Sequence, residues 1–153
     1  MTNYAYLESP IGLIELGGTA EALTTVAFVA QRRSGAESNA VVDEARRQLA
    51  EYFAGERRGF DAPLALRGSE FQLAVWNQLL SIPFGQMVSY QDIADALGKP
   101  QAVRAVGAAN GQNPIAIIVP CHRVVGSNGK LVGYGGGLWR KEWLLRHEGA
   151  LLL

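Results

Sequence analysis

The chain has 153 residues, of which 48% are hydrophobic and 18% charged, and its formal net charge is zero. This length suits one domain or two small lobes, and the apolar fraction is enough to bury a core. No segment approaches the roughly 18 apolar residues of a membrane-spanning helix, and the start lacks the basic and apolar regions of a signal peptide. We therefore expect a cytoplasmic protein with no membrane partner. One cysteine and two widely spaced histidines argue against a metal site, and nothing in the sequence requires a cofactor.

The zero net charge hides an asymmetry between the two halves. Residues 1–66 carry six Lys and Arg against nine Asp and Glu, a net charge of −3, whereas residues 67–153 carry eight against five, a net charge of +3. An excess of three charges is common by chance, so charge alone is weak evidence for nucleic-acid binding. It gains weight if the cations lie on a recognition element.

The first half has the pattern of a small antiparallel sheet with a covering helix. Short apolar runs separated by turn residues predict three strands at Tyr4–Tyr6, Ile11–Leu16 and Leu23–Val29. Apolar residues at helical spacing predict a helix over Val41–Phe53, which Gly55 ends. Because the stretch that follows lacks periodicity, we place a domain boundary there and expect an N-terminal α/β lobe over residues 1–66.

The second half, residues 67–153, is expected to be mainly helical. Ser69 has the position of a helix cap before an amphipathic run that reaches Leu80. Ser89 caps a second helix, Tyr90–Leu97, and Gly98 ends it before a third helix over Gln101–Asn110. Two short helices joined by so tight a turn predict a helix-turn-helix, and the fold class is therefore a two-lobed α/β protein with a winged-helix-like second lobe.

The helix predicted over Gln101–Asn110 has almost no bulky side chains. Small residues would let its backbone approach a DNA groove closely, with Gln101 and Arg104 left to make polar contacts. The same composition also suits a helix packed tightly in a core. The pattern alone does not choose between the two.

Cys121 is the only cysteine and follows the apolar run Ile115–Val119 directly after Pro120. A lone cysteine is most often a small buried apolar residue. Here the run predicts a strand that ends at the proline and presents the thiol beside His122 and Arg123. An electropositive setting of this kind lowers the pKa of a thiol, so we predict a reactive thiolate.

Three further segments follow the cysteine. Residues 127–130 predict a hairpin turn, the glycine-rich residues 133–137 a mobile loop, and Leu138–His147 a terminal helix. The glycine-rich loop lacks the lysine and hydroxyl residues of a phosphate-binding loop. It is better explained by close backbone approach to a flat ring.

Several motifs together resemble the O6-alkylguanine-DNA alkyltransferase family over residues 69–149. They agree in order and spacing: Val88-Ser89-Tyr90, Arg104-Ala105-Val106-Gly107, Asn113-Pro114, Pro120-Cys121-His122-Arg123-Val124, Gly136-Gly137-Leu138 and Lys141–Glu148. The resemblance implies direct reversal repair, in which a flipped O6-alkylguanine gives its alkyl group irreversibly to the cysteine, once per molecule. It extends to O4-alkylthymine and implies a monomer on double-stranded DNA, with cooperative assembly left open.

The resemblance also implies the site residues. Cys121 is the acceptor, His122 activates it through a water, Glu148 orients the imidazole, Tyr90 donates a proton to the departing guanine, and Asn113 braces the turn. The residues implied to contact DNA, with Arg104 entering the space of the flipped base, are Arg104, Ser89, Gln101, Ala102, Ala105, Gly107 and Arg123. Those implied to line the base pocket are Val124, Tyr134, Gly135 and Gly136.

Without the resemblance, Glu148 would be a solvated residue at a helix end and Tyr90 a core aromatic. The sequence also departs from some relatives, with Ala116 in place of a proline and Gly135 in place of a serine. Both changes remove bulk or a hydroxyl, which predicts a roomier pocket without strong preference for methyl over larger alkyl groups. Two other functions stay open: a non-catalytic lesion-binding protein, in which the cysteine would be replaced, and a cysteine hydrolase, which would need to regenerate its thiol.

Overall fold

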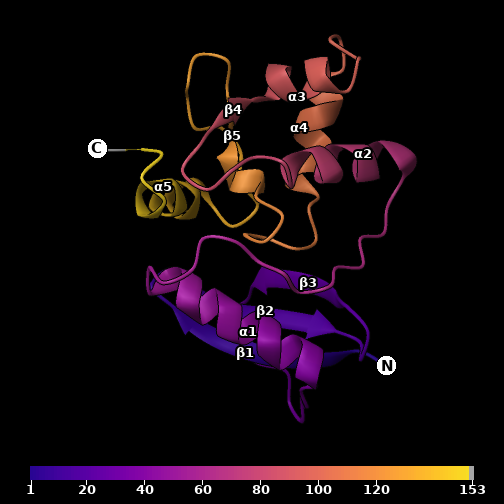
Figure 1. The fold of residues 1–153 in the computed structure, drawn as a ribbon, viewed down its shortest axis with the longest axis vertical. Coiled ribbons are helices and arrows are strands. Elements are labelled where there is room, and N and C mark those ends of the chain that lie inside the picture. Colours follow the sequence, from indigo (N-terminus) through magenta and orange to yellow (C-terminus); the bar gives the residue numbers. More distant parts are fainter. Residues whose placement is uncertain (152–153) are drawn as a thin grey trace. The chain divides into compact units, whose positions relative to one another are not determined.

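The computed structural model describes residues 1–151, which form two compact units (Figure 1). The first unit comprises Met1–Leu66 together with Pro114–Ala116. The second comprises Arg67–Asn113 and Ile117–Leu153. The chain therefore passes from one unit to the other near residue 66 and returns briefly to the first unit just before the cysteine.

The first unit is built on a three-stranded antiparallel sheet in the order β1-β2-β3. Its strands are β1 (Asn3–Ser9), β2 (Gly12–Gly18) and β3 (Leu23–Phe28). Ile14 and Leu16 of β2 and Val26 of β3 are buried and form the centre of its core. β1 extends beyond the predicted run at both ends and β2 extends two residues past Leu16, because ladder hydrogen bonds continue past the residues that pack. β2 begins one residue after the predicted Ile11, and β3 ends one residue before the predicted Val29.

Helix α1 (Ala40–Phe53) covers one face of this sheet (Figure 1). It begins at Asn39, whose side-chain oxygen accepts a hydrogen bond from the backbone N–H of Val42. The residues that it buries recur at helical spacing and are Val42, Ala45, Gln48, Leu49 and Tyr52. The predicted sheet with a covering helix is confirmed.

The strand predicted over Ile115–Val119 does not form. Ile115 makes a single parallel bridge to Val26 of β3, with hydrogen bonds from Val26 N to Pro114 O at 3.0 Å and from Ala116 N to Val26 O at 3.0 Å. The residues that follow turn instead of extending, and Ile117 has a positive φ of 72°. An apolar run this short is buried equally well by a turn, so its hydrophobicity did not specify a strand.

The second unit is mainly helical. Its helices are α2 (Glu70–Leu79), α3 (Tyr90–Ala96), α4 (Val103–Gly111) and α5 (Leu138–His147). The core between them includes Trp76 of α2, whose indole N–H donates to Ala109 O of α4 at 2.8 Å. The predicted terminal helix is confirmed at both ends, whereas the third predicted helix begins two residues later than expected because Ala102 is its N-cap.

Capping residues place α2 and α3. Ser69 and Ser89 each form a capping box, in which the serine side chain accepts from the backbone three residues on and that residue's side chain accepts from the serine N–H. Gly98, with a φ of 71°, ends α3 as predicted, since its left-handed conformation lets Lys99 N reach Ala94 O at 2.9 Å. The chain then turns into α4, which completes the helix-turn-helix.

Cys121 opens a short 3-10 helix, η1 (Cys121–Arg123), and does not lie at a strand end. The two-residue strand β5 (Val124–Val125) follows and pairs in parallel with β4 (Val88–Ser89). No pattern in the sequence predicted this pairing. A turn does follow at 126–130, closed by Gly126 N to Lys130 O at 2.9 Å, but β5 has no antiparallel partner among the described residues, so the predicted hairpin is wrong.

Within residues 1–151, no helix is long and apolar enough to cross a membrane.

Candidate active site

Cys121 is 6% exposed and starts η1, with its backbone N–H donating to Val119 O at 2.8 Å. Burial raises the pKa of its thiol, although a hydrogen bond from Asn113 and the charge of Lys141 act in the opposite direction. The prediction that neighbouring cations lower this pKa is therefore wrong for the protein without DNA. A buried thiol needs a base to become a nucleophile.

His122 is fully buried, and its Nε2 lies 2.7 Å from Oε2 of Glu148. Burial lowers the pKa of His122 more than the hydrogen bond and charge of Glu148 raise it, and the charge of Arg123 lowers it further. The ring is thus neutral at pH 7, and a neutral ring that donates from Nε2 carries its lone pair on Nδ1. Nδ1 is buried and has no hydrogen-bond partner among the described residues.

Arg123 holds the other side of Glu148. Its Nε donates to Oε1 at 2.8 Å, its Nη2 to Oε2 at 3.1 Å, and its Nη1 to Ile82 O at 2.7 Å. Burial alone would raise the pKa of Glu148, but the hydrogen bonds and charges of His122 and Arg123 hold it well below its ordinary value. Arg123 is only 6% exposed, so it leaves the set of predicted DNA contacts. A cation next to a histidine in the sequence is typical of a charged surface. The sequence therefore did not predict that Arg123 and Glu148 form a buried pair.

Asn113 braces the turn before the cysteine. Its Nδ2 donates to Val119 O at 2.7 Å, and a hydrogen bond from its side chain also lowers the pKa of Cys121. In the same turn Ile117 keeps a left-handed backbone, which costs a β-branched residue about 1–3 kcal/mol. The turn is therefore strained at Ile117 and held in place by Asn113, and this determines where η1 begins.

Lys141 is a site residue that sequence reasoning missed. It is fully buried in α5, and its Nζ donates to Val132 O at 3.0 Å, Gly133 O at 3.1 Å and the Tyr90 hydroxyl at 3.4 Å. Burial lowers its pKa to about 8, partly offset by the charge of Cys121. Fully buried lysines are rare unless they are paired, but in sequence this one stands among the ordinary charges of an amphipathic helix.

The Tyr90 hydroxyl donates to Val132 O at 2.9 Å. Burial raises the pKa of Tyr90 and the charge of Cys121 raises it further, so the phenol keeps its proton at pH 7. The structure thus places Tyr90 at the first turn of α3, near enough to Cys121 for the charge of the cysteine to raise the pKa of the phenol.

The glycine-rich loop supplies the remaining predicted pocket residues. Burial raises the pKa of Tyr134 well above its ordinary value. The charge of Cys121 raises this pKa further, which indicates that Tyr134 lies near the cysteine. Gly137 N donates to Tyr134 O at 2.9 Å, and Arg140 Nη1 donates to Gly136 O at 2.6 Å. A Cβ added at Gly135 would make only an ordinary contact, at 3.9 Å from Gly111 O. Val124, by contrast, is fully buried at the start of β5.

Helix α4 has one buried and one exposed face. Val106, Ala109 and Asn110 are buried, whereas Arg104 and Ala105 are exposed. The interpretation of a tightly packed helix is therefore confirmed for the buried face, whereas the approach of the exposed face to a DNA groove stays a prediction. No hydrogen bond or ion pair engages the Arg104 side chain within residues 1–151, which leaves its guanidinium available to a ligand.

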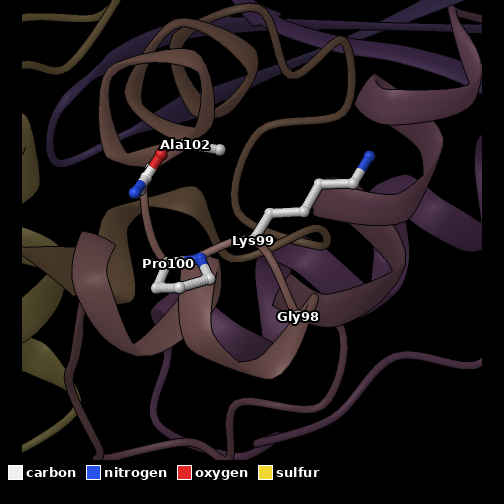
Figure 2. Close-up of a pocket in the computed structure, with 5 residues that line it drawn as sticks. Gly98, Lys99, Pro100 and Ala102 are labelled. Carbon is white, nitrogen blue, oxygen red and sulfur yellow. The ribbon is translucent and has the colours of Figure 1, made fainter.

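An open depression of about 570 Å³ lies at the turn of the helix-turn-helix (Figure 2). It is lined by Gly98, Lys99, Pro100, Gln101 and Ala102. Two predicted DNA-contacting residues, Gln101 and Ala102, thus lie at one surface feature, whereas none of the predicted base-pocket residues lines it. No cluster of three or more His, Cys, Asp or Glu within the described part of the chain could hold a metal.

The second unit carries both a helix-turn-helix and a buried thiol next to an imidazole–carboxylate pair. These features define the class: a DNA-binding protein with a nucleophilic cysteine. Residues 70–150 match the family described as "6-O-methylguanine DNA methyltransferase, DNA binding domain", and residues 2–66 match its "ribonuclease-like domain". The chain belongs to the O6-methylguanine DNA methyltransferase family.

Relatives match over nearly the whole chain. A methylated-DNA–protein-cysteine methyltransferase of Methanosarcina acetivorans is 52% identical, covering 96% of this chain and 98% of its own length. One of Mycolicibacterium paratuberculosis is also 52% identical, covering 97% and 93%. The crystal structure of Mycobacterium tuberculosis O6-methylguanine methyltransferase superimposes with a TM-score of 0.89 at 48% identity, covering 98% of this chain and 94% of that one. A structure of OGT from that organism in complex with DNA has a TM-score of 0.89 at 50% identity, covering 97% and 93%.

Proposed function

We propose that this chain repairs alkylated DNA by taking the alkyl group of O6-alkylguanine onto Cys121, once per molecule. Family membership makes it a methylated-DNA–protein-cysteine methyltransferase. The observation that carries the residue assignment is the buried series Arg123–Glu148–His122, which lies directly beside the only cysteine in the sequence. In the reaction the bond between O6 and the alkyl carbon breaks, a bond between that carbon and Sγ forms, and the thiol proton replaces the alkyl group on guanine.

His122 serves as the base. With Nε2 committed to Glu148, the lone pair on Nδ1 accepts the thiol proton, through a water as the family resemblance implies. The resulting imidazolium is stabilised by Glu148, which Arg123 keeps ionised and correctly turned. Lys141 adds a positive charge that favours the thiolate. Asn113 holds the turn on which the sulfur sits.

Tyr90 assists the leaving group. Departing guanine gathers negative charge on its ring, and a phenol that keeps its proton at pH 7 can donate to it. Lys141 donates to the phenol oxygen, which stabilises the negative charge that this oxygen gains as its proton leaves. Val124, Tyr134, Gly135 and Gly136 form the walls around the base in this proposal, and contact it largely through backbone groups.

The exposed face of α4 binds the DNA. Relatives include a protein solved in complex with DNA, and the positive charge of residues 67–153 suits a polyanion. Arg104 enters the space left by the flipped base and offsets part of the few kcal/mol that flipping costs. The other proposed contacts come from the cap of α3 and the start and exposed face of α4: Ser89, Gln101, Ala102, Ala105 and Gly107.

The proposal needs no cofactor or metal, and we propose that the chain acts as a monomer in the cytoplasm. Repair of O4-alkylthymine and a pocket that accepts bulky alkyl groups remain predictions.

The function is tested by weighing the protein after incubation with duplex DNA that contains one O6-methylguanine. We expect the intact protein and the peptide carrying Cys121 to gain a methyl group in place of a hydrogen, in a yield that saturates at one per molecule. Cys121→Ser should bind the same duplex without any gain, because a hydroxyl fills nearly the same space but is far less nucleophilic. Lesion binding by the wild-type protein without a mass gain would favour the non-catalytic lesion-binding function. Repeated turnover would favour the hydrolase.

A further inference from the structure

The loop that supplies part of the proposed base pocket has little conformational preference of its own. Residues 135–137 are consecutive glycines, and glycine loses more backbone freedom on ordering than any other residue. Gly137 N donates to Tyr134 O at 2.9 Å, which closes a turn inside the loop. Lys141 of α5 holds the carbonyl groups of residues 132 and 133, ahead of the glycines. These contacts offset only part of the entropy cost, so the glycines themselves need a contact from outside the loop.

Arg140 of α5 makes such a contact. Its Nη1 donates to Gly136 O at 2.6 Å. Because the C=O of a trans peptide points away from the N–H of the next residue, fixing Gly136 O also directs Gly137 N–H toward Tyr134 O. The charge of Arg140 also lowers the pKa of Tyr134, which shows that the guanidinium is near this predicted pocket residue. Arg140 thus determines the conformation of the pocket loop at its glycines.

Trp139 in turn holds the side chain of Arg140. The guanidinium carbon of Arg140 lies 4.6 Å from the centre of the indole, within the range of a cation–π contact. The indole also lies against the loop, since a Cβ added at Gly137 would come within 3.2 Å of its Cδ1. Trp139 is nevertheless 55% exposed, so its place is not explained by burial in the core.

We propose that Trp139 and Arg140 form a clasp that holds the pocket loop in the shape that receives the modified base. This inference rests on the proposed function. The clasp acts on the wall of the pocket, and the hydrogen bonds that join His122 and Arg123 to Glu148 do not pass through it. Both members of the clasp are therefore positioning residues, which set the affinity for the base and leave the rate of alkyl transfer from the bound base nearly unaltered.

The test uses O6-methylguanine as a free base, because duplex DNA would add phosphate groups with which an arginine can pair. Methylation is measured by mass over a series of base concentrations. Arg140→Ala should raise the concentration that gives half the maximal rate about tenfold and change the maximal rate less than about twofold. Trp139→Ala should raise the same concentration a few-fold. Arg140→Lys and Trp139→Phe, which keep a donor and a ring, should recover most of the lost affinity.

Hydrogen exchange measures the state of the loop directly. The Gly137 amide should exchange faster in Arg140→Ala than in the wild type, because the turn that it closes is no longer held through Gly136 O. Arg146→Ala is the matched control, since Arg146 lies on the same helix and pairs with Glu142 at the surface. It should change neither the methylation rates nor the exchange.

Three outcomes would overturn the clasp. The first is a folded Arg140→Ala variant with the half-saturating concentration of the wild type. The second is a loss confined to duplex DNA, which would make Arg140 a phosphate contact. The third is an unaltered half-saturating concentration in Trp139→Ala, which decides the matter alone if Arg140→Ala does not fold, because Trp139 is exposed. A wild-type protein that gains no methyl group from a duplex with O6-methylguanine would instead contradict the proposed function.

Discussion

The two units differ in how far they bury ion-paired side chains: among the described residues, the second unit buries a complete set, whereas each ion pair of the first unit leaves at least one partner partly exposed. In the first unit, ion pairs lie on the surface of α1 and the sheet, as with Arg47 and Glu51, which are 54% and 31% exposed. In the second unit, His122 and Glu148 have no exposed side-chain surface and Arg123 has 7%. Burying charge is costly, so a fold does so where the charges are used. The contrast places the chemistry in the second unit without reference to any relative.

The largest effect is expected from breaking the buried series. Glu148→Gln leaves Arg123 as an uncompensated buried cation, which should lower the free energy of unfolding by about 3–5 kcal/mol. It should also nearly abolish methyl transfer. Glu15→Gln in the first unit removes a carboxylate whose partner, Arg33, is 56% exposed, and should cost about 1 kcal/mol or less. Urea unfolding of both variants checks the contrast, and equal losses would contradict it.

The pH dependence of stability should follow the same series. The pKa values of both His122 and Glu148 are lowered in the folded protein, so the unfolded chain binds more protons as the pH falls. Their stabilisation is present above the ordinary histidine pKa of 6.5 and is lost below it, with Glu148 adding to the loss below 4.5. Unfolding measured between pH 7.5 and pH 5 should show this decline. His122→Asn should flatten it, and an unaltered slope in that variant would refute the assignment.

The charge of Arg104, on the exposed face of α4, should affect transfer from duplex DNA but not transfer from the free modified base. Arg104→Ala should slow transfer from duplex DNA about tenfold or more, the equivalent of roughly 1.4 kcal/mol of the flipping cost. Transfer from the free modified base should change little, because nothing has to be flipped. Arg47→Ala in the first unit serves as the control and should leave both rates unaltered. Equal losses on duplex and free base would remove Arg104 from its proposed role.

The sequence predicted much of this molecule because local signals agree with the fold. Serine caps, Gly98 and the apolar spacing of α1 and α5 located those elements to within a residue or two. It failed where a tertiary contact decides the outcome. The run before Cys121 turns because Ile115 joins the first unit and Asn113 holds Val119, and neither contact leaves a periodic trace.

The candidate site divides in the same way. Cys121, His122 and Glu148 could be assigned because the spacing of whole motifs carries a family resemblance. Lys141 could not, since burial is the property that makes it unusual, and burial depends on neighbours distant in sequence. Arg123 was misjudged for the same reason. A cation two residues after the cysteine suggests a contact with a DNA phosphate. In the structure Arg123 instead contacts Glu148, which lies 25 residues away in sequence.

The smallest expected effect is that of Gly107→Ala, which should stabilise the fold and weaken DNA binding. A Cβ added at Gly107 of α4 would meet nothing within 4 Å, so the fold itself does not require glycine there. Gly107→Ala should therefore raise the free energy of unfolding by about 0.5–1 kcal/mol, because alanine is the better helix former. If the helix backbone approaches the DNA groove closely, the same methyl group should weaken duplex binding a few-fold while transfer from the free modified base is unaffected. Thermal unfolding and DNA titration of one preparation measure both quantities. A variant that is more stable and binds DNA as tightly as the wild type would show that this face of α4 does not approach the groove at Gly107.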